Sequence, residues 1–302
     1  MVEDAPRTPD VVLFEAAPRD GLQNEKRAIP TADKVRLVDL LAETGLKRIE
    51  AASFVSPKWV PQMADGAQVM AGIRRVPGVQ FAALTPNPRG VEAAIAAEAD
   101  EVSIFASASE GFSKANLNRS VAESLAMFAP VAARAVDIGL PVRGYVSCVT
   151  DCPYDGPVAP EAVARVCEAL FALGCFEVSL GDTIGAGAPD TIGRMLETVL
   201  KGAPPEKLAG HFHDTGGRAV ENAGVALDLG LRVLDGSAGG LGGCPYAPGA
   251  AGNVDTRKLL ALCEARGLGA GVDAARLEVA SAFALGLRAP AEETQREENT
   301  DV

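Results

Sequence analysis

The two histidines of this 302-residue chain both lie in one pentapeptide, His211-Phe212-His213-Asp214-Thr215. Successive side chains of a strand alternate between its faces, so His211 and His213 would point to the same side. Two imidazoles on one face can bind one metal ion, while Phe212 faces the opposite layer. The alternative is an ordinary strand that happens to carry two histidines. The concentration of both histidines in one segment favours the metal site.

The elements that would position this pair alternate regularly between strand and helix. Short runs of apolar and β-branched residues predict strands at Val11–Glu15, Arg48–Ala52, Gln80–Leu84, Glu101–Ala106, Pro141–Val146, Phe176–Leu180, Leu208–His213 and Arg232–Asp235. Amphipathic segments between them predict helices at Thr31–Thr44, 65–74, Pro88–Ala97, Ser120–Ile138, Pro160–Leu173, Asp190–Leu200, Arg218–Leu229 and Asp255–Arg266. Thr31 can cap the first helix, which would end at Gly45.

Eight strands that alternate with eight helices predict an α/β fold, a (β/α)8 TIM barrel with extra C-terminal helices. A doubly wound sheet is the competing fold. It would favour a glycine-rich phosphate turn after the first strand, where this chain has Pro18-Arg19-Asp20-Gly21. The expected organisation is an N-terminal arm over 1–10, the barrel over 11–270, a helical appendage over 271–288 and a flexible tail over 289–302.

Polar residues collect at the carboxyl ends of the predicted strands, where the chemistry of such barrels takes place. They are Arg19, Asp20, Glu50, Ser53, Thr85, Asn87, Ser147, Cys148, Asp182, Thr183, His211 and His213. Taken singly, Asp20 could be a loop cap and Glu50 an ordinary salt-bridge partner. Buried charges need partners, however, and these groups would supply them for one another at one barrel mouth. Two imidazoles and a carboxylate would form an open site for a divalent cation.

The composition excludes several classes of protein. The net charge of −12 and the lack of a basic patch argue against a nucleic-acid partner. No apolar run approaches membrane-spanning length, and the N-terminal segment is neither a secretory signal nor an arginine-rich transit peptide. We therefore expect a cytoplasmic protein.

Six cysteines lie at positions 148, 152, 167, 175, 244 and 263. Cys148 and Cys152 resemble half of a zinc knuckle without its second half, and most of the six are expected to be small buried hydrophobic residues. Cys244 differs, because it lies in the glycine-rich segment from Gly239 to Gly252. That segment could be a linker, but its place in the last connection of the barrel favours a ligand-binding loop, where an exposed thiol would be reactive.

Three longer runs are distinctive: Pro18-Arg19-Asp20-Gly21-Leu22-Gln23-Asn24-Glu25, Ser53-Phe54-Val55-Ser56-Pro57-Lys58-Trp59-Val60-Pro61-Gln62-Met63 and Leu241-Gly242-Gly243-Cys244-Pro245-Tyr246-Ala247 with Gly252-Asn253. Together with the 143–148, 179–185 and 211–215 segments, they closely resemble the 3-hydroxy-3-methylglutaryl-CoA lyase family over roughly residues 11–288. The chain departs from the usual family pattern at Gly217 and at Ala250-Ala251, and no cysteine follows Cys263.

The resemblance implies a site for Mg²⁺ or Mn²⁺ held by Asp20, His211, His213 and Asn253. It places Arg19 opposite the thioester carbonyl, Glu50 and Asp182 in or around the site, and Cys244 on the substrate loop. The other substrate-binding residues that we expect are Gln23, Ser53, Ser147 and Thr183.

The reaction implied is the cleavage of 3-hydroxy-3-methylglutaryl-CoA to acetyl-CoA and acetoacetate, as in leucine degradation. The general base and acid stay open among Asp20, Glu50, His211 and Cys244. The alternatives are a lyase for a related branched hydroxyglutaryl-CoA, a Claisen-type condensing enzyme, and a non-catalytic metal-binding barrel. An acyl-CoA partner and a homodimer are expected.

Overall fold

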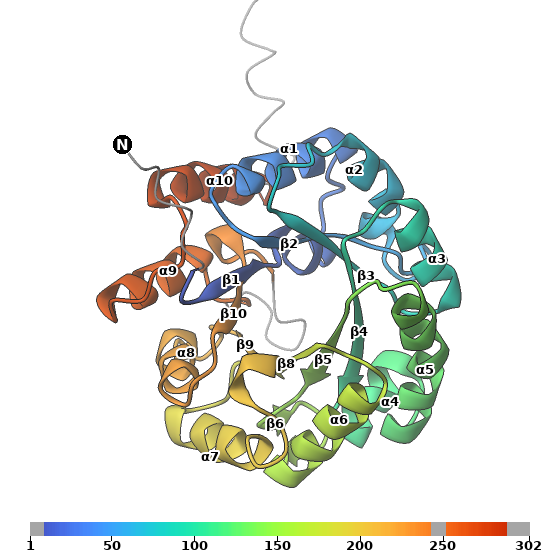
Figure 1. The fold of residues 1–302 in the computed structure, drawn as a ribbon, viewed down its shortest axis with the longest axis vertical. Coiled ribbons are helices and arrows are strands. Elements are labelled where there is room, and N and C mark those ends of the chain that lie inside the picture. Colours follow the sequence, from blue (N-terminus) through green and yellow to red (C-terminus); the bar gives the residue numbers. More distant parts are fainter. Residues whose placement is uncertain (1–8, 243–251, 289–302) are drawn as a thin grey trace, which may run out of the picture.

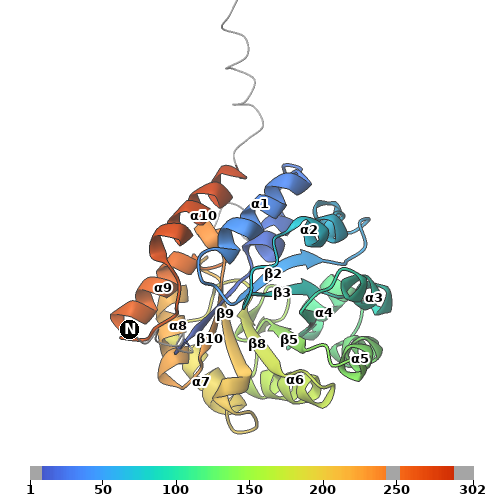
Figure 2. The ribbon, with the colours of Figure 1, turned by 45° about the horizontal axis from the view of Figure 1, so that its top comes forward.

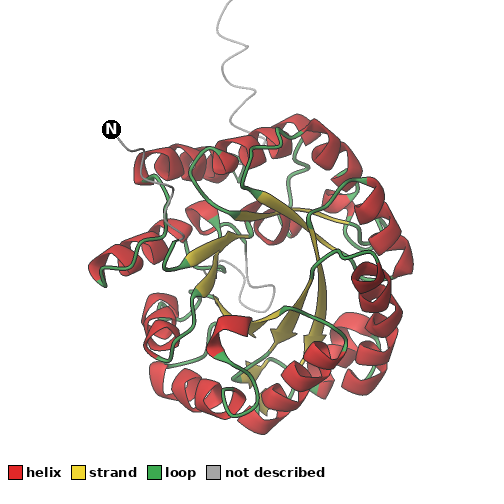
Figure 3. Cartoon of the chain, viewed as in Figure 1, coloured by secondary structure: helices red, strands yellow, loops and turns green. Residues whose placement is uncertain are grey.

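Eight parallel strands close into a barrel in the computed structural model, which describes residues 9–242 and 252–288. The strand order around the barrel is β1-β10-β9-β8-β5-β4-β3-β2, and β1 pairs with both β10 and β2. Helices form a ring outside the strands (Figures 1 and 3). The predicted (β/α)8 barrel is therefore confirmed. The doubly wound alternative is excluded because its sheet would stay open.

The barrel strands lie within one or two residues of their predicted limits. They are β1 (Val12–Glu15), β2 (Arg48–Ser53), β3 (Gln80–Leu84), β4 (Glu101–Ser107), β5 (Val142–Ser147), β8 (Glu177–Asp182), β9 (Leu208–Phe212) and β10 (Val233–Gly236). The largest apolar cluster lies between these strands and the helices that cover them. Burial of this layer is the main source of stability.

The predicted helices are present, most of them trimmed by one or two residues. They are α1 (Thr31–Ala42), α2 (Gly66–Gly72), α3 (Pro88–Ala96), α5 (Val121–Asp137), α6 (Pro160–Ala172), α7 (Pro189–Val199), α8 (Ala219–Asp228) and α9 (Thr256–Ala265). The predicted Thr31 cap is wrong. Helix α1 follows Pro30 without a side-chain cap, and the Thr31 hydroxyl donates to Asp65 Oδ2 at 2.7 Å instead.

Some elements were not expected from the sequence. Helix α4 (Glu110–Leu117) is capped by Ser109, whose hydroxyl accepts a hydrogen bond from the Phe112 N–H at 3.1 Å. The strands β6 (Asp151–Cys152) and β7 (Gly156–Pro157) form a small hairpin after β5. The other short elements are one π-turn, η1 (Ala17–Gly21), and three 3-10 turns, η2 (Pro61–Met63), η3 (Pro205–Lys207) and η4 (Ala238–Gly240). The π-turn matters most, because it carries Arg19 and Asp20.

Helix α10 (Ala274–Gly286) lies beside α1 on the outside of the barrel (Figures 1 and 2). Leu277, Ala280 and Ala284 are its buried apolar residues. This helix falls within the predicted appendage over 271–288. The predicted arm and tail fall largely on residues 1–8 and 289–302, which lie outside the described residues.

The lumen of the barrel combines a small apolar cluster with charged side chains. Phe14, Ala82, Ala209 and Val233 form the apolar part. The guanidinium groups of Arg48 and Arg143 lie 4.9 and 4.0 Å from the centre of the Phe14 ring. The small side chains of Ala82 and Ala209 leave room for these long arginine side chains inside the barrel.

Candidate active site

Asp20, His211 and His213 converge at the carboxyl ends of the strands. One ligand atom from each lies within 4.8 Å of the others, and each residue is half-buried. Asp20 comes from η1 after β1, while His211 is in β9 and His213 directly follows it. Across residues 9–242 and 252–288, no other group of three His, Cys, Asp or Glu side chains is placed to hold a metal ion.

The alternation predicted for the histidine pair is present. The His211 and His213 rings are 5.3 Å apart between centroids, and Phe212 is buried in the layer between strands and helices. Strand β9 pairs with β8 and β10, which brings His211 level with Gly181 and Asp235. A side chain at position 181 would be close to the His211 ring, since a Cβ there would lie 3.9 Å from His211 Cδ2.

The π-turn η1 presents Asp20 to the histidines. The Ala16 carbonyl accepts from both the Arg19 N–H at 3.2 Å and the Gly21 N–H at 3.1 Å. Isolated π-turns add a residue to a turn and are frequent at functional sites. The turn begins two residues after the end of β1, so Arg19 and Asp20 lie at the mouth of the barrel.

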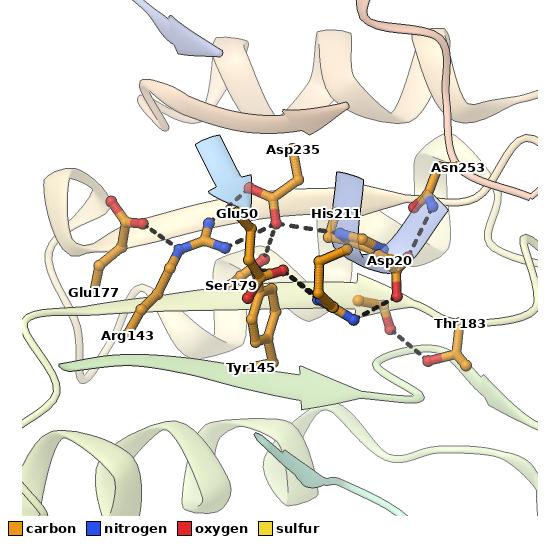
Figure 4. Close-up of polar contacts among 12 residues, drawn as sticks. Asp20, Glu50, Arg143, Tyr145, Glu177, Ser179, Thr183, His211, Asp235 and Asn253 are labelled. Carbon is orange, nitrogen blue, oxygen red and sulfur yellow. Dashed lines mark hydrogen bonds and ion pairs between the residues drawn. The ribbon is translucent and has the colours of Figure 1, made fainter. Parts of the chain in front are cut away.

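Asn253 lies next to this group, although it is distant from Asp20 in sequence. Its Nδ2 donates to Asp20 Oδ2 at 2.8 Å (Figure 4). It also donates to the Leu241 carbonyl at 3.2 Å. A β-bridge joins the backbones of Asn253 and His213. The residue that only the family resemblance suggested is thus in contact with Asp20 and His213, two of the three residues of the cluster.

Arg19 and Glu50 form a buried ion pair beside the cluster. Arg19 Nε donates to Glu50 Oε2 at 2.6 Å and Arg19 Nη1 donates to Asp20 Oδ1 at 2.6 Å. The Tyr145 hydroxyl also donates to Glu50 Oε2, at 3.3 Å. Glu50 Oε1 is buried and has no hydrogen-bond partner among the described residues. One oxygen of Glu50 thus fixes the guanidinium, and the other stays available.

The charges around the cluster set its protonation states. Burial opposes ionisation of Asp20, but the charges of Arg19, His211 and His213 outweigh it and lower the Asp20 pKa to about 2. Burial and the neighbouring His211 lower the pKa of His213 to about 4. At neutral pH the cluster therefore contains a carboxylate and at least one neutral imidazole, which are the forms that bind metal ions.

These residues fit a divalent cation. His213 Nδ1 is buried without a hydrogen-bond partner among the described residues, although a buried imidazole nitrogen normally has one. A site with one carboxylate and two imidazoles suits hard to borderline divalent metal ions. The predicted cation is supported by this geometry.

Asp235 orients His211 and was missed by the sequence analysis. Its Oδ2 lies 3.2 Å from His211 Nδ1 and accepts from the Ser179 hydroxyl at 2.8 Å. Burial opposes ionisation of Asp235, but Arg143 and His211 lower its pKa. Burial also opposes protonation of His211, but the hydrogen bond to Asp235 and the charge of that carboxylate raise the pKa of His211. With Nδ1 engaged, Nε2 is the His211 nitrogen left for the site.

A chain of ion pairs continues from Asp235 down the lumen. Arg143 donates to Asp235 Oδ1 at 2.6 Å and to Glu177 Oε1 at 2.6 Å (Figure 4). Arg48 then bridges Glu177 and Glu101, with contacts of 3.0 and 2.8 Å. We call Arg48, Glu101, Arg143, Glu177 and Asp235 the lumen ion chain. The sequence analysis did not predict these ion pairs, because a charged residue within a predicted strand can lie on either face of the sheet.

The structure does not connect Asp182 to the other charged site residues as expected. Its Oδ1 accepts from the Thr150 hydroxyl at 3.3 Å and its Oδ2 from the Gly187 N–H at 3.0 Å. Glu177 and Ser179 of β8 point into the lumen, so Asp182, an odd number of residues further along, points away. The expectation that it would partner Arg19, Asp20 or the histidines is wrong.

The other predicted residues are placed in different ways. Gln23 Nε2 lies 3.5 Å from Asp20 Oδ1. Ser53 is buried and accepts from the Val55 N–H, and the Thr183 hydroxyl accepts from the Cys148 N–H at 2.8 Å. Ser147 ends β5 opposite Gly181 of β8. Cys244 lies outside the described residues.

The five described cysteines are all buried and unpaired by disulfides: Cys148, Cys152, Cys167, Cys175 and Cys263. This confirms the expectation that most of the cysteines are small buried residues. The backbone of Cys148 is left-handed (φ 60°). Its N–H donates to the Thr183 hydroxyl and not to a neighbouring strand.

Comparisons with known proteins agree with this site. The HMGL-like family pattern matches residues 10–283. Hydroxymethylglutaryl-CoA lyase, mitochondrial, of Gallus gallus is 53% identical over 88% of this chain and 90% of its own length. The crystal structure of an HMG-CoA lyase from Brucella melitensis is 59% identical, with a TM-score of 0.92 over 93% of this chain and 99% of that chain.

A third relative is described with ligands. It is an HMG-CoA lyase from Acinetobacter baumannii in complex with coenzyme A and 3-methylmalate, 35% identical, with a TM-score of 0.87 over 99% of both chains. The resemblance found in the sequence and the expected class, a carbon–carbon lyase, are confirmed by these matches. The chain belongs to the HMGL-like family.

Proposed function

We propose that this chain cleaves 3-hydroxy-3-methylglutaryl-CoA into acetyl-CoA and acetoacetate. One observation supports this most: the Asp20, His211 and His213 cluster lies directly beside a buried arginine, in a chain half-identical to lyases of that name. A cation held by the Asp20, His211 and His213 cluster could bind a hydroxyl and a carboxylate of the substrate. The guanidinium of Arg19 could bind the thioester oxygen.

The proposed cation is Mg²⁺ or Mn²⁺, held by Asp20, His211, His213 and Asn253. When bound, it supplies Lewis acidity towards the hydroxyl and carboxylate oxygens of the substrate. Asp235 keeps His211 in the orientation that this site needs, through its contact with Nδ1.

Arg19 would stabilise the charge that develops as the carbon–carbon bond breaks. The electron pair of that bond passes into the thioester enolate, so negative charge grows on the thioester oxygen. Arg19 is buried and bonded to Glu50 and Asp20, so its guanidinium is already oriented before the substrate arrives. A donor fixed in this way needs no reorganisation during the reaction.

A base must take the hydroxyl proton, and an acid must protonate the enolate. Asp20, Glu50, His211 and Cys244 are the candidates. The unpartnered Oε1 of Glu50 favours Glu50 for one of these roles, because a buried carboxylate oxygen beside the site can accept a proton without first breaking a hydrogen bond. Gln23, Ser53, Ser147 and Thr183 are proposed to contact the substrate.

The test is to incubate metal-stripped protein with 3-hydroxy-3-methylglutaryl-CoA, with Mg²⁺, with Mn²⁺ or without metal, and to measure acetyl-CoA and acetoacetate. We expect cleavage only with metal, and the ratio of rates identifies the preferred cation. Failure to cleave by folded protein that binds Mn²⁺ would contradict the proposal. A panel of related branched hydroxyglutaryl-CoA esters would then be tested.

Compartment and assembly are also proposals. Among the described residues, no helix is both long and apolar enough to cross a membrane. The relatives include lyases named mitochondrial and lyases named cytoplasmic. We propose a cytoplasmic homodimer, which fractionation and sedimentation of the native protein would test.

A further inference from the structure

Glu15 is a buried acid that the proposed chemistry does not use. It is the last residue of β1, and its side chain is fully buried. Phe14 points into the lumen, so Glu15 points outward, into the layer between the barrel and its helices. A buried carboxylate is costly unless donors surround it.

Three donors from three separate segments meet at this carboxylate. Glu15 Oε1 accepts from the Ala17 N–H at 2.8 Å and from the Ala238 N–H at 2.9 Å. Glu15 Oε2 accepts from the Thr256 hydroxyl at 2.7 Å. The donors belong to η1, to η4 and to the start of α9.

Each of these segments leads to a residue of the candidate site. Ala17 begins the π-turn that holds Arg19 and Asp20, and Thr256 comes three residues after Asn253. Ala238 begins the turn that leads to Leu241, whose carbonyl accepts from Asn253.

The same segments are in close contact at the site itself. Asn253 joins Asp20 and the Leu241 carbonyl by hydrogen bonds of 2.8 and 3.2 Å. Gly21 packs so closely that a Cβ there would lie 2.8 Å from Leu241 Cβ and from Ser237 Oγ. Glu15 thus joins η1, η4 and the start of α9 in the buried layer. Asn253, which precedes α9, joins the same three segments at the barrel mouth.

We propose that Glu15 is a positioning residue, which sets the separation of Asp20 and Asn253 by holding η1, η4 and the start of α9 together. Loss of its oxygens would leave two buried N–H groups and a hydroxyl without acceptors, and these segments would move apart to reach other partners. The inference depends on the proposed function only through the metal site, so it can be tested with Mn²⁺ alone.

The experiment compares Mn²⁺ affinity, by calorimetry on metal-free folded protein, in wild type, Glu15→Ala and Glu15→Gln. We expect Glu15→Ala to weaken Mn²⁺ binding by about tenfold or more, the usual effect of removing a residue that orients a metal ligand without touching the metal. Glu15→Gln keeps the shape and an oxygen for both N–H donors. It should bind within about twofold of wild type.

Two controls separate positioning from general destabilisation. Val131→Ala truncates a fully buried side chain of α5 far from the site, and it should lower stability without changing Mn²⁺ affinity. In an Asn253→Ala background, Glu15→Ala should have a smaller effect than in wild type, because the ligand that it positions is gone. Additive effects would contradict the proposal.

If Glu15→Ala does not fold, the same Mn²⁺ affinity measurement is made on Thr256→Val. It removes one of the three donors while keeping the side-chain shape, and Mn²⁺ affinity should fall by about threefold or more, with recovery in Thr256→Ser. Wild-type affinity in Thr256→Val would overturn the inference. Wild-type protein that binds Mn²⁺ but does not cleave the thioester would overturn the proposed function alone.

Discussion

Arg19 is the residue whose contacts specify its role most narrowly. Two carboxylates hold its guanidinium, and the Tyr145 ring lies 5.7 Å from it. Burial opposes the charge, yet the carboxylates of Glu50 and Asp20 raise its pKa, so the group is a permanent cation. A cation fixed in this way can stabilise an oxyanion but cannot transfer a proton.

Replacement of Arg19 should therefore affect the chemical step. We expect Arg19→Met to lower kcat by roughly 10²–10³-fold, since one preorganised donor contributes about 3–4 kcal/mol to the barrier. Mn²⁺ affinity should change much less, which calorimetry would check. Arg75→Met removes a partly exposed arginine, and its kcat should equal that of wild type. Near-normal turnover in folded Arg19→Met would remove Arg19 from the mechanism.

Asp235 should act on metal binding through His211. Asp235→Asn replaces the carboxylate that faces His211 Nδ1 and Arg143, and we expect Mn²⁺ affinity to fall by about 10–100-fold. Ser179→Ala is the matched control, because it removes only the hydroxyl that donates to Asp235. Its affinity should stay near the wild-type value. Equal affinities in the two variants would show that Asp235 does not orient the histidine.

Glu15 also predicts a pH dependence of stability. Burial raises its pKa from 4.5 to about 7 despite the hydrogen bonds from Thr256, Ala238 and Ala17, and the nearby Asp255 adds to the rise. The folded state therefore holds this proton more tightly than the unfolded state. Its contribution to stability is complete below pH 4.5 and is lost as the pH rises to about 7.

The measurement is the difference in unfolding free energy between wild type and Glu15→Gln, which has no such proton. From pH 5 to pH 8 this difference should shift in favour of Glu15→Gln, by up to about 3 kcal/mol for a shift of this size. A difference that stays constant over this range would mean that Glu15 has an ordinary pKa in the folded protein.

At the scale of elements, the strands were predictable and the turns were not. Apolar runs such as that of β3 are long enough to mark a strand, so its limits were predicted without error. The π-turn is different, since nothing in Ala17-Pro18-Arg19-Asp20-Gly21 distinguishes it from an ordinary loop. Helix α4 was missed because its eight residues are mostly polar or small.

The residues of the candidate site also divide into those that the sequence predicted and those that it did not. Asp20, Glu50 and the histidines were predictable, because charges at strand ends need one another. Asp182 was misplaced because the predicted strand ended at Leu180, whereas β8 continues to Asp182, and the alternation of side chains along the strand then turns Asp182 away from the lumen. Tyr145 and Asp235 were missed because they lie within strands, and only the closed barrel reveals that they face the lumen.

The packing of the π-turn leads to a prediction for Gly21. A methyl group there would meet Leu241 and Ser237 at 2.8 Å, so Gly21→Ala should displace the turn and weaken Mn²⁺ binding by about tenfold. Gly193 in α7 is the matched control. A Cβ there would lie 3.7 Å from Val225, an ordinary contact, so Gly193→Ala should raise stability by about 0.5–1 kcal/mol. Wild-type metal affinity in Gly21→Ala would contradict a rigid π-turn.

At the scale of the whole molecule, burial makes the described thiols inert. It raises the pKa of Cys148, Cys167 and Cys175 to about 12 and that of Cys263 to about 11. Cys152 is buried as well. Thiolates are the reactive form, so the four thiols with a raised pKa should react slowly in the folded protein, and burial keeps Cys152 from contact with a reagent in solution.

Thiol titration with Ellman's reagent at pH 8 would test this. We expect one rapidly reacting thiol in the native protein, all six after denaturation, and no rapid thiol in native Cys244→Ser. Protection of that thiol by substrate would place Cys244 beside the ligand. Two or more rapid thiols would mean that the barrel opens readily in solution.

The contact between Asp20 and Asn253 has a consequence for biosynthesis. These residues are 233 positions apart, and β10 must pair with β1 before they can meet. A chain that is being synthesised presents Asp20 first, then the two histidines, and Asn253 last of the four. The complete set of four predicted ligands therefore assembles only once residue 253 has been made, so a product truncated before that position is not expected to compete with the intact protein for the cell's supply of cation.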